Sequence, residues 1–382
     1  MAARQHFDVL VIGAGVFGAW TAHFLQRSGA QVLLVDAFGP GNSRSSSGGE
    51  SRVIRRGYGA DEIYTRLAQH SMSLWRTLFE ERGLEHFKQS GVLWLAREGD
   101  LYSTRMLSVL ATTGVRFEKI ERGDLEKRYP QIAFGPVTWG ILEIDSGVLL
   151  ARYAVQAVVA DAVKGGVSYL TDSINPPTGA FTAITTRTGR RFSADTFIFA
   201  CGPWLPKLFP DLLGNLIHIT RQEVFFFGVS PGDDRFSFPK MPVLIDFYEL
   251  VYCIPDLEGR GFKFAIDAHG PTFDPDSGDR VVASAGVEAV RQKLARLIPA
   301  LERAPILETR VCQYENTSSG DFLIDHHPEF PNVWLVGGGS GHGFKHGPAV
   351  GEYVASLIKG NAEVEPRFTL ATKTAVHQRK VF

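Results

Sequence analysis

Cysteine is scarce in this sequence. Its 382 residues include three cysteines, Cys201, Cys253 and Cys312, which are odd in number and lie far apart. This spacing excludes a framework of paired disulfides and a zinc site built from closely spaced cysteine pairs. We therefore expect a protein of a reducing compartment, and we predict a cytoplasmic location.

An excess of charge of either sign is absent as well. Lysine and arginine together number 40 and aspartate and glutamate 41, so the formal net charge is -1. Proteins that bind nucleic acids or anionic membrane surfaces usually carry a basic excess, and we expect neither partner. No stretch approaches the roughly 20 consecutive apolar residues of a membrane-spanning helix. The glycines of the apolar N-terminal segment are also untypical of a signal peptide.

A glycine-rich segment, residues 8–36, is the best-defined motif that is present. An apolar run at residues 9–12 predicts a strand, residues 19–27 have a helical pattern, and a second apolar run ends at Asp36. Three glycines, Gly13, Gly15 and Gly18, separate the first strand from the helix. This order of strand, glycine turn, helix and strand is typical of a dinucleotide-binding unit.

Each glycine of this turn has a predicted role. Gly13 allows the tight turn, Gly15 allows backbone N–H groups to approach a pyrophosphate, and Gly18 allows the helix to pack closely on the sheet. Asp36 is placed to accept hydrogen bonds from an adenosine ribose. The alternative is a glycine turn that binds no nucleotide. The unit by itself does not distinguish FAD from NAD, because both contain an adenosine diphosphate half.

The segment after Asp36 is rich in glycine and serine and then in arginine. Arg52, Arg55 and Arg56 fall within five residues, beside Tyr58. Clustered guanidinium groups are typical of anion recognition. A disordered surface loop is the alternative interpretation of the same composition.

The remaining patterns predict the following elements. Helices are expected at residues 61–83, 101–113, 148–164, 285–297 and 349–358. Strands are expected at residues 91–96, 137–144, 167–170, 181–186, 191–192, 195–202, 322–325 and 332–339. The many aromatic and β-branched residues of 217–252 predict a multi-stranded antiparallel sheet that covers the substrate. The glycines of 337–343 predict a second nest of backbone N–H groups.

Four stretches match a known family. They are VIGAGVFG with Asp36, ESRVIRRGYG at residues 50–59, YCIPDLEGRGFK at 252–263, and VCQYENTSSGDFLIDHHP at 311–328 with GGGSGHGFKHGP at 337–348. On these motifs the chain resembles, over nearly its whole length, the monomeric sarcosine oxidase family. That family comprises FAD-dependent amine oxidases of the D-amino-acid-oxidase-like group. The resemblance implies FAD as the cofactor.

The resemblance also implies roles for individual residues. Cys312 matches the cysteine that carries the flavin through a thioether, and Lys263 the lysine associated with oxygen activation. Arg55 and Lys345 match the pair that binds the substrate carboxylate. Arg52 matches the arginine that covers the flavin, and Tyr252 and Tyr314 match tyrosines of the substrate cavity. Further cofactor contacts are expected at Ser43, Arg44, Gly202, Gly339, Gly341, His342, Gly343, Phe344 and Lys345.

Two positions depart from the family pattern. Gly48 stands where the family often has a histidine, two residues before the acidic Glu50. Asp267 stands where many members have a histidine, four residues after Lys263, and His269 follows two residues later. We expect Gly48, Asp267 and His269 to border the substrate, so the sequence does not fix sarcosine as the substrate.

The fold implied by these observations is α/β. A chain of this length is expected to form two lobes. A discontinuous, Rossmann-like FAD-binding domain would comprise residues 1–88, 148–214 and 321–362. An α+β substrate domain with a large antiparallel sheet would comprise residues 89–147, 215–320 and 363–382. The family resemblance implies a monomer.

The predicted function is that of an FAD-dependent oxidase of a secondary or primary α-amino acid. Hydride would pass from the substrate Cα–H or N-methyl group to flavin N5, and O2 would reoxidise the flavin to give hydrogen peroxide. An amino-acid dehydrogenase of the same fold and a non-catalytic FAD-binding subunit are the alternatives. His326, His327, His342 and His346 lie close in sequence, but Pro328 breaks their helical spacing, so no metal site is expected.

Overall fold

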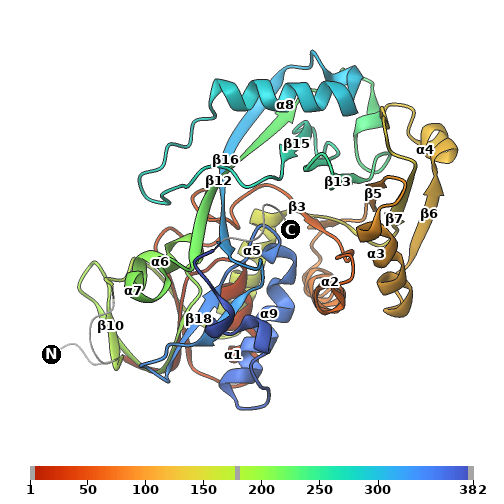
Figure 1. The fold of residues 1–382 in the computed structure, drawn as a ribbon. Coiled ribbons are helices and arrows are strands. Elements are labelled where there is room, and N and C mark those ends of the chain that lie inside the picture. The colour runs from red at the N-terminus through yellow and green to blue at the C-terminus, as the bar shows by residue number, and fades with distance from the viewer. Residues whose placement is uncertain (1–4, 177–180, 377–382) are drawn as a thin grey trace.

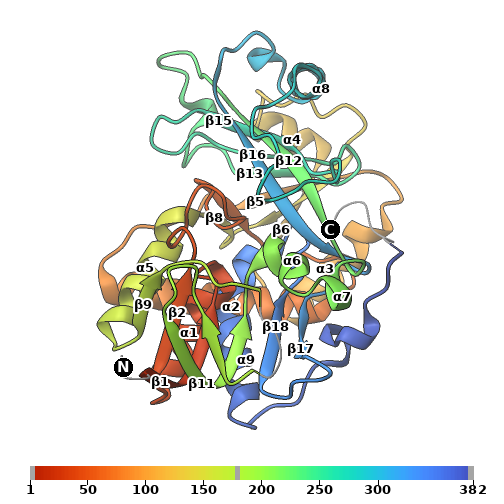
Figure 2. The same cartoon turned by 90° about the vertical axis from the view of Figure 1, so that its left-hand side faces the viewer.

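The computed structural model describes residues 5–176 and 181–376. Two sheets form two lobes (Figure 1). The lower lobe contains the N-terminal βαβ unit, and the upper lobe contains a large sheet with α8 (Ser284–Leu297) on its outer side. Figure 2 shows two long strands, β12 (Ile217–Phe227) and β16 (Ile306–Thr317), running from the upper lobe toward the lower one.

The lower lobe is built on a sheet of mostly parallel strands. Its strand order is β17-β18-β11-β1-β2-β9, with β10 paired to β11. The strands are β1 (Gln5–Ile12), β2 (Val32–Asp36), β9 (Ser168–Thr171), β10 (Ala183–Thr185), β11 (Arg191–Phe199), β17 (Leu323–His326) and β18 (Val333–Gly337). The pairings of β9, β2, β1, β11 and β18 are parallel, whereas β17 and β10 add antiparallel edges. This is the predicted Rossmann-like sheet, assembled from separated parts of the chain.

Helices with closely packed backbones cover this sheet. They are α1 (Val16–Arg27), α2 (Glu62–Arg82), α5 (Ala151–Lys164) and α9 (Gly347–Ile358). Their apolar side chains form one core with the sheet, including Trp20 and Trp75. A Cβ atom at Gly351 of α9 would lie 2.5 Å from the backbone of Trp20 in α1. The absence of a side chain at Gly351 therefore allows α1 and α9 to pack in contact.

The upper lobe contains an eight-stranded sheet. Its order is β16-β12-β15-β14-β13-β5-β7-β6. The strands not yet given are β5 (Val92–Ala96), β6 (Phe117–Glu121), β7 (Trp139–Glu143), β13 (Val243–Asp246), β14 (Val251–Ile254) and β15 (Phe262–Ile266). Phenylalanine and branched apolar side chains supply its core, as the composition of 217–252 predicts. The sheet is antiparallel except that β13 and β5 pair in parallel, which is a difference from the wholly antiparallel sheet expected.

Smaller elements complete the fold. Helices α3 (Leu101–Thr112) and α4 (Arg122–Arg128) flank the upper sheet, and α6 (Leu205–Leu208) and α7 (Pro210–Leu213) follow β11. A three-stranded sheet joins β3 (Arg52–Ile54), β8 (Gly147–Leu149) and β4 (Phe87–Lys88) in the order β3-β8-β4. Arg52 is thus held in a sheet, and Arg55 and Arg56, which follow β3, are buried, which contradicts the disordered-loop alternative.

Two expectations from the sequence differ from the structure. The helix expected at 148–164 begins at Ala151, because Gly147–Leu149 pairs with β3 and β4 as strand β8. Residues 363–376 pack on the first domain, where Phe368 joins the α1 and α2 core and Arg367 binds Asp61 and Asp321. We expected these residues in the substrate domain, but they pack on the FAD-binding domain instead.

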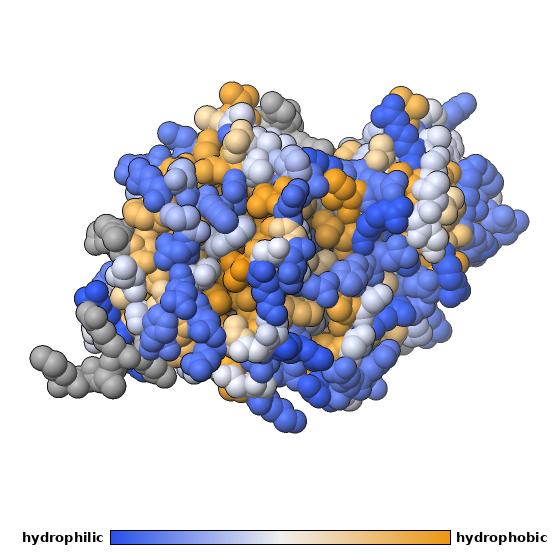
Figure 3. All heavy atoms as spheres, turned by 90° about the horizontal axis from the view of Figure 1, so that it is seen from below, coloured by the Kyte–Doolittle hydropathy of each residue, from blue (hydrophilic) through white to orange (hydrophobic). Residues whose placement is uncertain are grey.

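No helix among residues 5–176 and 181–376 is both long and apolar enough to span a membrane. Hydrophilic side chains cover much of the face in Figure 3, with apolar ones visible between them. Among the described residues, the exposed large apolar side chains, such as Leu101, Val281 and Leu307, lie at separate positions in the sequence.

Candidate active site

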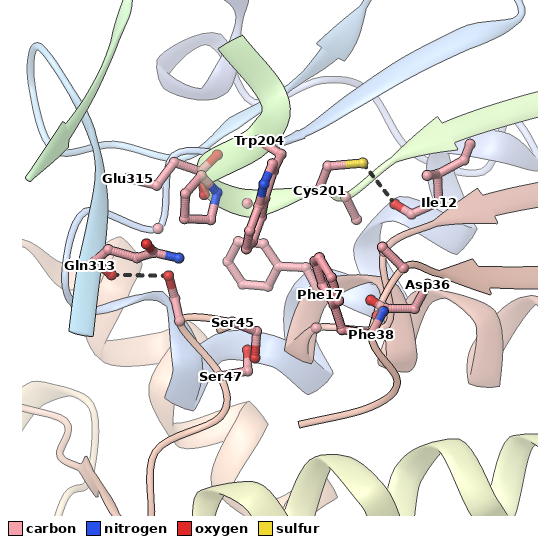
Figure 4. A pocket seen from close by; sticks show the side chains of 18 of the residues that line it. Ile12, Phe17, Asp36, Phe38, Ser45, Ser47, Cys201, Trp204, Gln313 and Glu315 are labelled. Atoms are coloured by element: carbon pink, nitrogen blue, oxygen red, sulfur yellow. Dashed lines mark hydrogen bonds between the residues drawn. The ribbon is translucent and has the colours of Figure 1, made fainter. Parts of the chain in front are cut away.

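A long cavity of about 420 Å³ lies where the first βαβ unit meets β16. Asp36 and Phe38 lie on its right side in Figure 4, and Gln313 and Glu315 lie on its left. The glycine turn, the serines of 45–47 and the Gly339–Phe344 segment also line it. The cavity thus connects the carboxyl ends of β1 and β2, where a dinucleotide is expected, with a strand of the second domain.

The glycines of the turn lie at close backbone contacts or beside the cavity. Gly13 has φ 104°, and a Cβ atom there would lie 2.3 Å from the carbonyl oxygen of Ala200. A Cβ atom at Gly18 would lie 1.9 Å from the carbonyl oxygen of Gly13. A Cβ atom at Gly15 would lie 3.5 Å from the Ser47 hydroxyl, its one contact within 4 Å among the described residues. The backbone of Gly15 therefore borders the open cavity.

Asp36 closes the turn from the end of β2. Its carboxylate accepts hydrogen bonds from the backbone N–H groups of Ala14, Phe38 and Gly39, each at 2.8 Å. Burial raises the pKa of Asp36, and these three donors partly oppose the rise by favouring the charged form. The carboxylate therefore fixes the turn and also borders the cavity, as expected of a ribose-binding group.

In the loop that follows β2, three expected site residues, Ser43, Arg44 and Gly48, lie outside the linings of both cavities. Ser43 accepts a hydrogen bond from Arg310 through its carbonyl oxygen, and Arg44 stacks over Phe38 at 5.0 Å from the ring centroid. Gly48 packs inside its loop, where a Cβ atom would lie 1.7 Å from the carbonyl oxygen of Asn42. Ser47, which the sequence motifs do not identify, fixes the glycine turn instead. Its hydroxyl oxygen accepts a hydrogen bond from the backbone N–H of Val16 at 3.1 Å.

A second cavity of about 100 Å³ adjoins the first. Six residues line both cavities: Arg52, Cys312, Tyr314, Ser340, Gly341 and Phe344. Other residues line the second cavity but not the first. They include Arg55, Tyr252 of β14, Lys263, Asp267 and Lys345. The structure therefore brings together most of the residues that the sequence assigned to substrate and flavin, from five separated stretches of the chain.

Arg55 and Lys345 meet at Tyr58. The guanidinium carbon of Arg55 lies 4.3 Å from the centroid of the Tyr58 ring, and Lys345 Nζ donates to the Tyr58 hydroxyl at 2.8 Å. Arg55 also stacks on Trp94 at 4.8 Å and donates to the carbonyl oxygen of Gly57. The sequence does not identify Tyr58 as a site residue. Its place beside Arg55 in the RRGYG motif is the feature that could have indicated a role in the site.

The Lys345 ammonium is 4% exposed and lies near the Arg55 guanidinium. Burial, and then repulsion from Arg55, lower the pKa of Lys345 well below its usual range. Its hydrogen bonds go to the Tyr58 hydroxyl and to the carbonyl oxygen of His342 at 2.9 Å. An anion placed between these two side chains would favour the charged form of the lysine.

Lys263 lies on β15 at another part of the wall. Its ammonium donates to the carbonyl oxygen of Ser51 at 3.0 Å and lies 5.7 Å from the Tyr252 ring centroid. Burial, followed by repulsion from Arg52, lowers the pKa of Lys263 to about 7. A solvated strand lysine, the alternative interpretation of the sequence, is excluded by its exposure of 3%.

Arg52 and Cys312 lie side by side where the cavities meet. The Arg52 Nη2 atom lies 3.5 Å from Cys312 Sγ and 2.6 Å from the carbonyl oxygen of Ser46. A Cβ atom at Gly341, whose φ is 79°, would lie 2.7 Å from the Tyr314 ring. Cys312 and Tyr314 follow each other at alternate positions of β16 and both border the two cavities.

Asp267 faces the same space. Its Oδ1 atom accepts a hydrogen bond from the Tyr314 hydroxyl at 2.8 Å. Burial raises the pKa of Asp267 to about 6, while Tyr314, Arg55 and Lys345 favour the charged form. His269 is not part of the cavity lining, and its ring lies 6.2 Å from that of Tyr314.

The histidines serve packing and hydrogen bonding. The Tyr58 hydroxyl lies 3.2 Å from His342 Nδ1 and 2.7 Å from His346 Nε2, and His342 stacks on Phe322. In the part of the chain that the structure describes, no group of three histidine, cysteine or acidic side chains is placed to hold a metal ion.

The cavities fit FAD. The Gly13 to Gly18 turn leaves backbone N–H groups and free space where a diphosphate would bind, at the N-terminus of α1. Asp36 would hold the adenosine end, and Cys312, Arg52 and Phe344 lie at the far end of the cavity, beside the second cavity.

Comparisons with known proteins agree with this geometry. The family model described as FAD dependent oxidoreductase (DAO) matches residues 8–357. The chain is 31% identical over 371 residues to the monomeric sarcosine oxidase of Bacillus sp. (strain B-0618), with 94% of each chain covered. It is 30% identical over 382 residues to the peroxisomal sarcosine oxidase of Homo sapiens, covering 97% of this chain and 96% of the other.

The fold is shared with solved structures of lower identity. L-proline dehydrogenase from P. horikoshii superposes with a TM-score of 0.82 at 23% identity, covering 96% of this chain and 97% of the other. The resemblance predicted from the motifs is thereby confirmed. The chain belongs to the family of FAD-dependent oxidoreductases that includes the sarcosine oxidases.

Proposed function

We propose that this protein is an FAD-dependent oxidase of small secondary or primary α-amino acids. The observation that carries the proposal is the pair formed by Arg55 and Lys345, two buried cations that meet at Tyr58 in a small cavity beside the cofactor cavity. Two cations in one enclosed site favour a carboxylate ligand. The curated relatives with this activity in their names act on sarcosine or on N-methyl-L-tryptophan.

The two cations would fix the substrate by its carboxylate. Arg55 is held by the rings of Tyr58 and Trp94, and Lys345 by the Tyr58 hydroxyl, so neither side chain has to be ordered when the ligand binds. Positioning of this kind lowers the activation barrier because the reacting C–H bond is already oriented. A bound carboxylate would also favour the charged form of Lys345.

The amine of the substrate has to be neutral before its neighbouring C–H bond can be oxidised. Arg52, Arg55 and Lys263 lie around the cavity and would lower the pKa of a bound amine by repulsion. Asp267 would accept a hydrogen bond or a proton from that amine. When bound, FAD supplies the acceptor for the hydride.

Lys263 would serve the second half of the reaction. Its charged form, fixed at the wall shared with Tyr252, would stabilise the negative charge that forms as O2 is reduced. The overall reaction takes an amino acid and O2 to an imino acid and hydrogen peroxide, and water then hydrolyses the imino acid.

Cys312 would carry the flavin covalently. Its position at the junction of the two cavities, with Sγ 3.5 Å from the Arg52 guanidinium, supports this assignment. The monomeric state and the cytoplasmic location stay predictions of the sequence.

An amino-acid dehydrogenase of the same fold is the second candidate, since a structure with this fold is named a dehydrogenase. Anaerobic mixing with a panel of amino acids and their N-methyl forms tests both candidates, because each predicts bleaching of the flavin band. Stopped-flow mixing of the reduced protein with O2 then separates them. Fast reoxidation with formation of hydrogen peroxide supports the oxidase, and slow reoxidation supports the dehydrogenase. Failure of every amine to bleach the flavin would favour a non-catalytic FAD-binding subunit.

A further inference from the structure

Glu315 is a buried carboxylic acid in the wall of the cofactor cavity. It lies on β16 between the residues of the substrate site and the Gly337 turn, and it is 7% exposed. Neither the glycine motif of the first βαβ unit nor the cationic substrate cavity uses it. A buried carboxyl oxygen without a hydrogen-bond donor is costly, and one oxygen of Glu315 has no donor among the described residues.

Two glycines hold the carboxyl group in place. A Cβ atom at Gly337 would lie 2.3 Å from Glu315 Oε1, so only a glycine permits this carboxyl position. The ideal Cβ position of Gly202, a residue of the cavity lining, lies 3.8 Å from the other oxygen, Oε2. The Oε1 atom has no hydrogen-bond partner among the described residues. The side chain is thus confined, with one oxygen beside a cavity residue.

The position of Glu315 along the cavity identifies which part of the cofactor it faces. In Figure 4 Glu315 lies beside Trp204 and across the cavity from Asp36, which stands at the adenosine end. The next residue toward the substrate cavity on β16, Tyr314, borders the flavin end. Glu315 therefore lies along the middle of FAD, which consists of the diphosphate and the ribityl chain.

Only one of these two groups suits a carboxylate. The diphosphate is anionic and has no hydrogen-bond donor at neutral pH, whereas the ribityl chain carries three hydroxyl donors. We infer that Glu315 binds FAD by accepting a hydrogen bond from a hydroxyl of the ribityl chain. The inference concerns cofactor binding and holds whether or not the protein oxidises amino acids.

The charge state of the acid supports this assignment. Burial raises the pKa of Glu315 to about 7, although the amides of Gly338 and Gly339 favour the charged form. A hydroxyl donor also favours the charged form. Binding of FAD would therefore release a proton from Glu315 below about pH 7, and the affinity would rise as the pH is raised toward that value.

The test measures FAD affinity in the absence of any substrate. Apoprotein carrying Cys312→Ala, so that attachment does not mask the equilibrium, is titrated with FAD and the quenching of flavin fluorescence is followed. Glu315→Ala is expected to weaken binding about tenfold to hundredfold, as for a hydrogen bond to a charged group. Glu315→Gln, which keeps an acceptor oxygen and the shape, is expected to weaken binding less and to abolish the pH dependence between 5 and 7.

FAD analogues that lack single ribityl hydroxyls identify the partner. The analogue that lacks the hydroxyl bound by Glu315 is expected to bind the parent protein about tenfold or more weakly than FAD does. In Glu315→Ala this analogue and FAD are expected to bind with the same affinity. Asp321→Asn is the matched control, because Asp321 is also buried but binds Tyr64 and Arg367 outside the cavity. Unchanged FAD affinity in both Glu315 variants, or an affinity that falls as the pH rises toward 7, would overturn the inference. If Glu315→Ala does not fold, the pH profile of Glu315→Gln decides.

Discussion

The Tyr314 hydroxyl donates a hydrogen bond of 2.8 Å to Oδ1 of Asp267. This contact joins β16 to the segment after β15 and directs a carboxylate into a cavity that also contains Arg55 and Lys345. An acid at this position distinguishes the chain from family members with a histidine there. It makes Asp267 the natural group to interact with the amine of the substrate.

The pH dependence of activity should report on Asp267. Because the charged form is the useful one, kcat/KM for an amino-acid substrate is expected to fall as the pH is lowered through about 6. Asp267→Asn should remove this limb of the profile and lower kcat/KM at pH 7 about tenfold or more. Tyr314→Phe should move the limb to higher pH, since the tyrosine hydroxyl favours the carboxylate. An unchanged profile in both variants would exclude Asp267 from this role.

Replacement of Arg55, one of the two residues proposed to bind the substrate carboxylate, should weaken substrate binding. Arg55→Lys keeps the charge but loses the planar fork, so KM is expected to rise about tenfold or more with the flavin spectrum unchanged. Arg56→Lys is the matched control, because Arg56 is equally buried but pairs with Glu143 away from the cavity. A similar rise of KM in both variants would point to a general effect on the fold.

Loss of Lys263 should slow the oxidative half-reaction selectively. Lys263→Met is expected to reduce the rate of reoxidation by O2 about 10²-fold, since a preorganised charge contributes on this scale. Flavin reduction by substrate under anaerobic conditions should change far less. In the parent protein the reoxidation rate should fall as the pH rises through the pKa of Lys263, which burial places at about 7. Lys263→Arg should keep its charge and lose that dependence, and a variant that reoxidises normally would remove Lys263 from the oxidase mechanism.

Covalent attachment through Cys312 predicts a yellow pellet after acid precipitation. Cys312→Ala should release its flavin into the supernatant. Cys201→Ala is the control, because Cys201 also lines the cofactor cavity but hydrogen-bonds the carbonyl oxygen of Ile12 rather than lying at the flavin end. A colourless pellet from the parent protein would show that the flavin is not attached.

The glycine turn gives a prediction for stability and cofactor binding together. Gly18→Ala would place a methyl group 1.9 Å from the carbonyl oxygen of Gly13, so a loss of about 3 kcal/mol in unfolding free energy and loss of FAD are expected. Gly123→Ala, in α4 with nothing within 4 Å, should leave both unchanged or add about 0.5 kcal/mol. Thermal unfolding and flavin content of the purified variants measure the two effects.

The parts of the fold that the sequence predicts well are those set by local patterns. The turn from Gly13 to Gly18 and helix α2 follow from glycine spacing and apolar periodicity, and both occur as predicted. The sequence predicts a helix at strand β8, because Val148 and Leu149 are apolar and only their pairing with β3 makes them a strand. Phe368 packs on α2 through contacts between distant residues, which no local pattern contains.

The candidate site divides in the same way. Arg55, Lys263 and Lys345 were selected by motif, and the structure places all three around one cavity. Tyr58 and Glu315 were not selected, because their roles depend on neighbours far away in the sequence, namely Lys345 for Tyr58 and Gly202 for Glu315. Gly48 and Ser43 were selected by position in a loop whose folding turns them away from the cavities.

The central claim is that Arg55 and Lys345 hold the carboxylate of an amino acid against FAD. The most direct test compares anaerobic flavin reduction by an N-methyl amino acid and by the same amine without its carboxylate, in the parent protein and in Lys345→Met. The account predicts rapid bleaching by the amino acid alone in the parent protein, and loss of that preference in the variant. Equal rates of bleaching by the acid and the carboxylate-free amine in the parent protein would contradict it.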